Sequence, residues 1–288
     1  MGWTGCLATA AVLLTAACGS GATTGGSGSA VGRPAPATPS TTVPAPSTPA
    51  TSTRPSSTTP AAPSSHHSSP PTTHTPHHAP AAAATRLPLD APAGSARQVI
   101  TVVAPSTSST RATVQAWRKV SGGWARVGPA VPAWVGSAGL STHTSEGRSA
   151  TPIGSFTLTR AFGADADPGT RLPYTRTTPD DWWISQPGKL YNTRQRCAAR
   201  CDFTRGDPNE HLYFETPYYD YAVVIDYNTR NAPGGVRQGA GSAFFLHVHP
   251  DGTGATAGCV AIPSDQLVRI MRWLAPAQNP RILIGVHR

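Results

Sequence analysis

Acidic residues are absent from the first 89 positions of this chain, and large apolar residues are scarce between positions 19 and 85. Asp90 is the first of 14 carboxylates, and 58 of the 67 residues from 19 to 85 are Ser, Thr, Pro, Ala or Gly. A segment with so little to bury cannot offset the conformational entropy that folding removes. We therefore predict a disordered linker over residues 19–85, stiffened by 13 prolines, and one folded domain over residues 86–288.

Lysine is also rare, and the positive charge is not clustered. Lys119 and Lys189 are the only lysines, and the residues from Arg86 onward carry a net charge of +7. Proteins that bind nucleic acid usually concentrate such charge in a stripe or a recognisable module, and the sequence has neither. We expect no nucleic-acid partner and a monomer. An ordinary basic surface and contact with an anionic extracellular polymer both stay open.

Long hydrophobic runs are missing at the N-terminus. The apolar run at residues 7–17 is too short to cross a bilayer in the mature protein, but it fits the core of a secretory signal. Residues 14–18, LTAAC, resemble a bacterial lipobox, in which the cysteine becomes the lipidated first residue. We predict a signal peptide over residues 1–18 and lipidation of Cys18, with plain cleavage as the alternative. The protein is then expected on the outer face of the cytoplasmic membrane or in the cell wall.

Cysteine is sparse, and each of the five cysteines has a predicted role. Cys6 leaves with the signal peptide, and Cys18 carries the lipid. Cys197 and Cys201 lie four residues apart, which outside the cytosol favours a disulfide over half of a zinc site. Cys259 has no partner, and a lone thiol in an oxidising compartment is either buried and inert or a nucleophile.

The folded part is predicted to be mostly β with one helix near its C-terminus. Ser264 is a candidate N-cap, apolar residues recur at positions 267, 270, 271 and 274, and Pro276 ends the pattern. Segments rich in Val, Ile, Phe and Tyr and bounded by Gly, Pro, Ser or Asn predict strands. These segments are residues 98–104, 112–120, 124–127, 155–160, 221–227, 243–249 and 281–286.

The segment from 241 to 262, GSAFFLHVHPDGTGATAGCVAI, carries the residues best suited to catalysis. An apolar strand delivers His247, a Gly-rich loop follows, and Cys259 stands at the edge of the next apolar stretch. A base on a rigid strand beside a cysteine is what nucleophilic catalysis needs. Gly258 directly before the cysteine allows backbone amides to face a substrate carbonyl.

The chain resembles the L,D-transpeptidase catalytic domain, the YkuD-like family. The similar blocks are TPIGSF at 151–156, LPY at 172–174, YN at 191–192, EHL at 210–212, GSAFFLHV at 241–248 and TAGCVAIP at 256–263. The resemblance extends from about Gln98 to the C-terminus and implies a β-rich, sandwich-like catalytic fold. The sequence departs from the family pattern at Ala257 and Ala261, where members often have His and Arg.

The resemblance also implies a chemistry. Cys259 is the expected nucleophile and His247 the expected base, with the imidazole oriented by the Val248 carbonyl. The amides of Gly258 and Cys259 are the expected oxyanion donors. Residues expected at the substrate are Thr256, His249, His211 and Tyr219.

The implied substrate is the tetrapeptide stem of peptidoglycan. Attack of the cysteine on the third residue releases D-alanine, and a side-chain amine of a second stem forms a 3→3 cross-link. Water as acceptor makes the protein an L,D-carboxypeptidase. An amidase and a catalytically silent wall-binding lipoprotein stay open as alternatives. Members of the family are acylated by carbapenems.

A metal site is the competing interpretation of the same strand. His247 and His249 share one face of it, because residues two apart point the same way, and HVHPD is similar to the start of a metallo-hydrolase site. Further ligands are sparse, with His143, His211 and Asp251 as the loose candidates. We therefore expect no metal and no cofactor.

Overall fold

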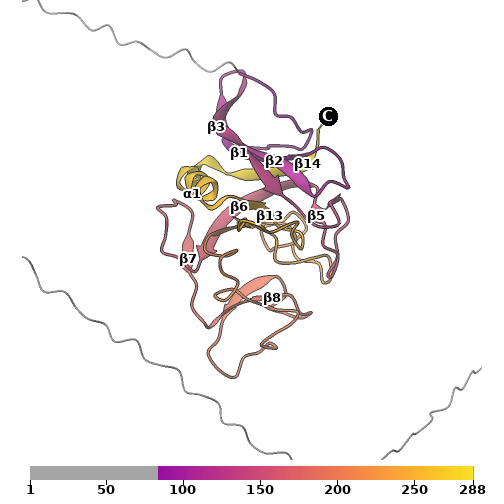
Figure 1. The fold of residues 1–288 in the computed structure, drawn as a ribbon, viewed down its shortest axis with the longest axis vertical. Helices are drawn as coiled ribbons and strands as arrows, with labels where there is room; N and C mark the ends of the chain where they lie inside the picture. Colours follow the sequence, from indigo (N-terminus) through magenta and orange to yellow (C-terminus); the bar gives the residue numbers. More distant parts are fainter. Residues whose placement is uncertain (1–83, 288) are drawn as a thin grey trace, which may run out of the picture. The chain divides into compact units, whose positions relative to one another are not determined.

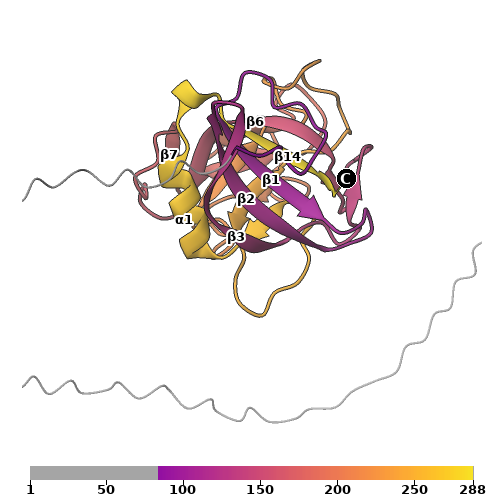
Figure 2. The ribbon, with the colours of Figure 1, turned by 90° about the horizontal axis from the view of Figure 1, so that it is seen from above.

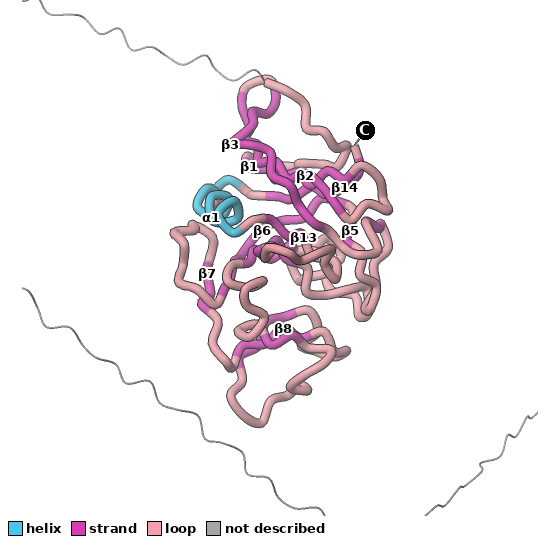
Figure 3. Tube along the Cα trace, viewed as in Figure 1, coloured by secondary structure: helices cyan, strands magenta, loops and turns pink. Residues whose placement is uncertain are grey.

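In the computed structural model, residues 84–287 are described, and they are mostly β with one α-helix (Figures 1 and 3), which confirms the predicted class. The strands are β1 (Gln98–Ala104), β2 (Arg111–Val120), β3 (Gly123–Trp134), β4 (Leu140–Ser141), β5 (Thr151–Pro152), β6 (Gly154–Gly163), β7 (Tyr174–Arg176), β8 (Asp181–Ile184), β9 (Thr193–Arg196), β10 (Glu210–His211), β11 (Ala222–Ile225), β12 (Phe245–Val248), β13 (Val260–Ile262) and β14 (Arg281–Val286). The helix α1 spans Ser264–Trp273, and a 3-10 turn, η1, spans Pro276–Gln278.

Nine of these strands form one sheet that closes on itself. Its order is β11-β12-β13-β3-β2-β1-β14-β6-β7, and β11 also pairs with β6. Figure 2 labels β3, β2, β1, β14, β6 and β7 of this sheet. Two of the pairings at the heart of the sheet are parallel, β1 with β14 and β12 with β13. The contact that joins β13 to β3 is the single pair Ala261–Trp134, and β7 is an edge strand that pairs with β6.

Alternate side chains of the closed sheet point to one apolar core. Ile100 and Val102 of β1, Leu246 of β12 and Ile262 of β13 are fully buried there. Such alternation is the period of two expected of strands. The helix adds its apolar stripe to the same core, with Leu267, Ile270, Met271 and Leu274 all buried.

The helix begins one residue away from the predicted cap. Pro263 occupies the N-cap position without a side-chain hydrogen bond, and Ser264 is the first helical residue. Proline has a fixed φ and lacks a donor, so it can start a helix whose first N–H groups have no partner within the helix. The helix ends before Pro276, as the pattern predicted.

The N-terminal end of the described chain is fastened to the sheet. Thr85, the last residue of the predicted linker, forms a β-bridge with Trp124 of β3. The signal peptide, Cys18 and the rest of the predicted linker lie outside the described residues. Among residues 84–287, no helix is both long and apolar enough to cross a membrane.

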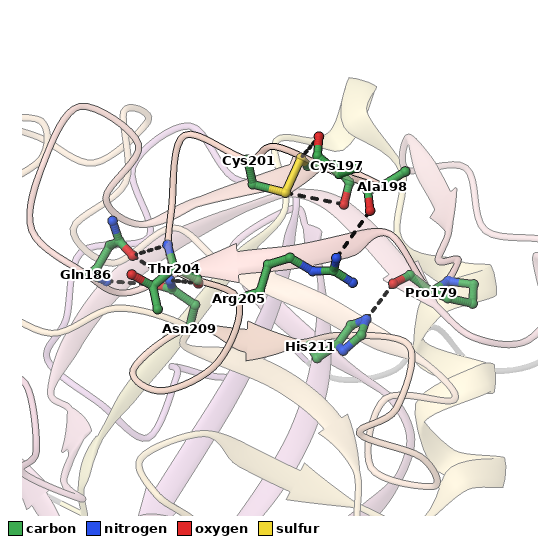
Figure 4. The surroundings of a disulfide bond; sticks show 10 residues. Pro179, Gln186, Cys197, Ala198, Cys201, Thr204, Arg205, Asn209 and His211 are labelled. Atoms are coloured by element: carbon green, nitrogen blue, oxygen red, sulfur yellow. Dashed lines mark hydrogen bonds between the residues drawn. A yellow bond between two sulfur atoms is a disulfide. The ribbon is translucent and has the colours of Figure 1, made fainter.

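A second, three-stranded sheet of order β10-β8-β9 lies in the long connection between β7 and β11. Asp181 at the start of β8 is fully buried and forms ion pairs with Arg194 and Arg196 of β9. Cys197 and Cys201, directly after β9, form the predicted disulfide, which is confirmed (Figure 4). The disulfide and the ion pairs to buried Asp181 together fasten the loops that lead into β10.

Candidate active site

The strand register places Cys259 and His247 on the same face of the sheet. In the parallel pair β12–β13, Leu246 is opposite Val260, so Cys259 lies beside Phe245. The Phe245 N–H donates to the Cys259 sulfur at 3.3 Å. Residues 245 and 247 share a face because strand side chains alternate. Leu246 points to the closed core, so the thiol and the imidazole lie on the outer face of the sheet.

The protonation form of His247 follows from its hydrogen bond. Nδ1 lies 2.7 Å from the Val248 carbonyl oxygen, which can only accept, so Nδ1 carries the proton in the neutral ring. Nε2 is then the basic nitrogen. Burial lowers the pKa of His247 to about 4, the Val248 carbonyl opposes that shift, and nearby His249 adds to it. The ring is therefore neutral at physiological pH and able to accept a proton.

The Cys259 thiol is held in a protonated state. Its side chain donates to the Ala243 carbonyl at 3.2 Å and accepts from the Phe245 N–H at 3.3 Å. Burial raises the pKa of the thiol, and the nearby carboxylate of Glu210 raises it further, while the Phe245 N–H works against both. A thiol in this setting needs a base before it can attack.

The turn that precedes the nucleophile is held by two threonine hydroxyls. Thr256 Oγ1 donates to the Cys259 carbonyl at 2.7 Å and accepts from the Gly258 N–H at 3.1 Å. The Gly258 amide, one of the two expected oxyanion donors, is therefore already occupied by Thr256. Gly258 itself has a φ of +134°, and a Cβ there would lie 2.8 Å from the Phe244 ring. Glycine is required at this position.

Thr151 is the second support, and it is fully buried. Its hydroxyl donates to the Gly258 carbonyl at 2.8 Å and accepts from the Gly136 N–H at 2.8 Å. One side chain of the TPIGSF block thus joins the nucleophile turn to the end of β3. The sequence showed this block only as a resemblance to the family and gave no sign of the contact, because both partners of Thr151 are distant in the chain.

Replacing Thr151 with Val is expected to destabilise the protein by about 1–3 kcal/mol, because the Gly136 N–H and the Gly258 carbonyl lose a buried partner. Denaturant unfolding measures this change. Thr142→Val is the matched control, since the Thr142 hydroxyl is exposed and bonds only the neighbouring His143 ring. Equal stability of the two variants would contradict the bracing role.

The aromatic wall beside the pair is built from Phe162, Trp183, Tyr219 and Phe245, which are packed edge to face or stacked. The Tyr219 ring also meets the His247 imidazole, with centroids 5.5 Å apart. Its hydroxyl donates to Oε2 of Glu210 at 2.8 Å, so a carboxylate lies beside these aromatic residues.

These residues open on a cleft of about 770 Å³. Cys259, His247, Thr256, His249 and Tyr219 all line it, as do the two departures from the family pattern, Ala257 and Ala261. His211 is not among the lining residues. Its ring stacks on Trp182, 3.9 Å between centroids, and its Nε2 bonds the Pro179 carbonyl (Figure 4). The expected substrate role of His211 is thus not supported by its position, whereas its neighbour Glu210 does line the cleft.

A family model described as the L,D-transpeptidase catalytic domain, YkuD, matches residues 97–282. The chain belongs to the L,D-transpeptidase family. No curated protein and no solved structure matches it. Membership identifies an enzyme of this family, with peptidoglycan as its substrate. The matched span contains the cysteine, the histidine and both bracing threonines described above.

His249 is held as part of the cleft wall of this L,D-transpeptidase domain. The His249 ring stacks on the Trp134 ring, with centroids 3.5 Å apart. The Arg111 guanidinium lies 4.3 Å from the centre of the Trp134 ring. Its Nε2 lies 3.0 Å from the Thr253 hydroxyl. Among the described residues, no group of three or more His, Cys, Asp or Glu side chains is arranged to hold a metal ion.

Proposed function

We propose that this protein is a cysteine L,D-transpeptidase that forms 3→3 cross-links between peptidoglycan stems through an acyl-enzyme on Cys259. The observation that carries the proposal is the hydrogen bond from His247 Nδ1 to the Val248 carbonyl. It assigns the basic lone pair to Nε2 of a ring that shares one sheet face and one cleft with the thiol.

Acylation begins with the thiol leaving the Ala243 carbonyl and giving its proton to His247 Nε2. The sulfur electron pair forms a bond to the carbonyl carbon on the L-centre of the third stem residue. The bond to D-alanine then breaks, and the leaving amine takes the proton from His247. With the Gly258 N–H bonded to Thr256, the Cys259 N–H is the remaining expected donor to the oxyanion.

Transfer completes the cycle. A side-chain amine of a second stem attacks the thioester, the carbon–sulfur bond breaks, and the released thiolate recovers a proton through His247. The expected product is a dimer that has lost one D-alanine. Water attacking the same thioester releases the donor as a tripeptide, which is the carboxypeptidase outcome.

The test is incubation of the purified chain with a tetrapeptide muropeptide, followed by mass spectrometry of both protein and products. We expect a covalent adduct on Cys259 and a dimer minus D-alanine. Tripeptide alone would assign the hydrolase. If the chain forms no adduct with the muropeptide or with a carbapenem, yet still binds peptidoglycan, it is a wall-binding module.

We further propose that the protein is exported and anchored through lipid on Cys18. The LTAAC sequence and the Cys197–Cys201 disulfide, a bond typical of oxidising compartments, support this location. In a host that processes lipoproteins, Cys18→Ala is expected to move the protein from the membrane fraction to the soluble fraction. Unchanged fractionation would reject the anchor.

A further inference from the structure

Glu210 is a carboxylate in the catalytic cleft without a cation to balance it. Tyr219 is its hydrogen-bond partner, at Oε2, and among residues 84–287 no Lys, Arg or His forms an ion pair with it. The residue opens on the cleft at one side, but surrounding protein removes enough water from its carboxyl to raise its pKa to about 7. A desolvated carboxylate with no cation is costly to keep ionised.

The position of Glu210 works against the first half of the reaction. Its charge raises the pKa of the Cys259 thiol and so disfavours the thiolate. Acylation alone therefore gives no reason for a carboxylate here. The charge does suit a cation that enters the cleft, because an opposite charge brought to a desolvated site is strongly attracted.

The charged groups around Glu210 also favour a cationic ligand. Glu146 and Glu215 raise its pKa further, and the Tyr219 hydroxyl lowers it. The rest of the cleft lining adds one carboxylate, Asp207, and one guanidinium, Arg148. Since His247 is neutral at physiological pH, carboxylates outnumber cations in the lining.

We propose that Glu210 receives the acyl acceptor: its carboxylate binds the primary ammonium group of the second stem and takes a proton from it, so that a neutral amine attacks the thioester. The inference rests on the proposed transferase function. Tyr219 is the positioning residue, because its ring lies against His247 and its hydroxyl holds Glu210. Tyr219 thus contacts both the carboxylate and the imidazole, and both line the cleft that the acceptor nitrogen must enter.

The protons and electrons balance in this scheme. The ammonium gives one proton to Glu210, and the freed lone pair forms the carbon–nitrogen bond while the carbon–sulfur bond breaks. The second proton on nitrogen passes to His247 Nε2 and then to the Cys259 thiolate. Glu210 returns its proton to water, and the free enzyme is restored.

The test separates acylation from transfer in the Glu210→Gln variant. Acyl-enzyme formed from a tetrapeptide donor is followed by intact mass, and its partition is measured with two nucleophiles. One is the stem amine, which is an ammonium ion at pH 7. The other is hydroxylamine, which is neutral at that pH and needs no deprotonation before attack.

We expect Glu210→Gln to form the acyl-enzyme, to lose about 100-fold in transfer to the stem amine, and to keep transfer to hydroxylamine. Asp265→Asn is the control, because it removes a carboxylate charge from an exposed position on α1 outside the cleft lining and is expected to leave both transfers nearly unchanged. Equal loss for the two nucleophiles, or no loss, would overturn the inference.

A pH profile supplies a readout that a purely structural role would not move. Transfer to the stem amine in the wild type is expected to fall as pH drops through about 7, where Glu210 gains a proton. Tyr219→Phe removes a hydrogen bond that favours the ionised carboxyl. The fall in transfer on the acidic side of the pH profile, its acidic limb, should therefore move to higher pH. A limb that stays in place in Glu210→Gln would also overturn the inference.

Two further controls keep the outcomes distinct. Glu210→Gln should be at least as stable as the wild type at pH 8, since it replaces an uncompensated charge by a neutral group of the same shape. Thermal unfolding checks this. A wild-type chain that forms no acyl-enzyme at all would remove the proposed function itself, whereas adduct formation without selective loss in Glu210→Gln removes only the role of Glu210.

Discussion

Replacing Cys259 with Ser is expected to reduce product formation from the tetrapeptide on the order of 10⁴-fold, with no adduct detectable by intact mass. The serine hydroxyl can keep both hydrogen bonds of the thiol, from the Phe245 N–H and to the Ala243 carbonyl. The fold is therefore preserved while the nucleophile is lost. A hydroxyl is a far weaker acid than a thiol, and a neutral His247 with a pKa of about 4 is too weak a base to ionise it.

Cys259→Ala is the second variant in this experiment, and the comparison is informative. Alanine leaves the buried Phe245 N–H without its sulfur acceptor, so this variant should unfold at a lower temperature than Cys259→Ser. Both should be equally inactive. Substantial residual turnover in either variant would show that the acyl group is carried by another residue.

Replacing His247 with Gln is expected to slow acylation of Cys259 by about 10³-fold. Burial and Glu210 both hold the thiol in its protonated form, so the thiolate is scarce at neutral pH unless a base takes the proton. The Gln side chain fits a strand position of similar size but has no basic nitrogen. Stopped incubations with a carbapenem or tetrapeptide, read by intact mass, give the acylation rate.

The pH dependence distinguishes loss of the base from a general distortion of the cleft. In the wild type, acylation should persist in acid and fall only as pH drops through about 4, because the imidazole stays neutral above that value. In His247→Gln this limb should vanish, and the rate should rise with pH as the thiol ionises. A wild-type limb near the ordinary histidine value would contradict the buried, neutral ring.

Several elements of the fold could be predicted because local sequence and tertiary environment agree. Strands β1 and β14 are apolar runs rich in Val and Ile, and their predicted bounds match the structure. Strand β3 is different: the prediction stopped at Val127, whereas the strand continues to Trp134 through Pro129 and Pro132. Pairing with β2 and one bulge accommodate the prolines, a tertiary effect that residue propensity cannot show.

The sequence alone predicts some residues of the candidate site and not others, for the same reason. Cys259 and His247 stand out because their residue types and spacing are unusual in sequence. Thr151 and Glu210 do not, since their importance comes from partners far away in the chain; the Thr151 hydroxyl meets a carbonyl 107 residues later. His211 belongs to a block that resembles the family, but its ring nitrogen bonds the Pro179 carbonyl and the residue is not among those that line the cleft.

The closed sheet limits how an extended substrate can be recognised. Strand β12 is paired on one side with β11 and on the other with β13, and β13 is paired in turn with β3. Both edges of β12 are paired in the described part of the chain, so a stem peptide cannot be added beside this strand as an extra β-strand. Its recognition must therefore come from side chains and loop amides above the sheet face. Substrate choice can then change by exchange of those loops, at residues 145–149, 207–219 and 241–243, while the strands that hold the thiol and imidazole stay the same.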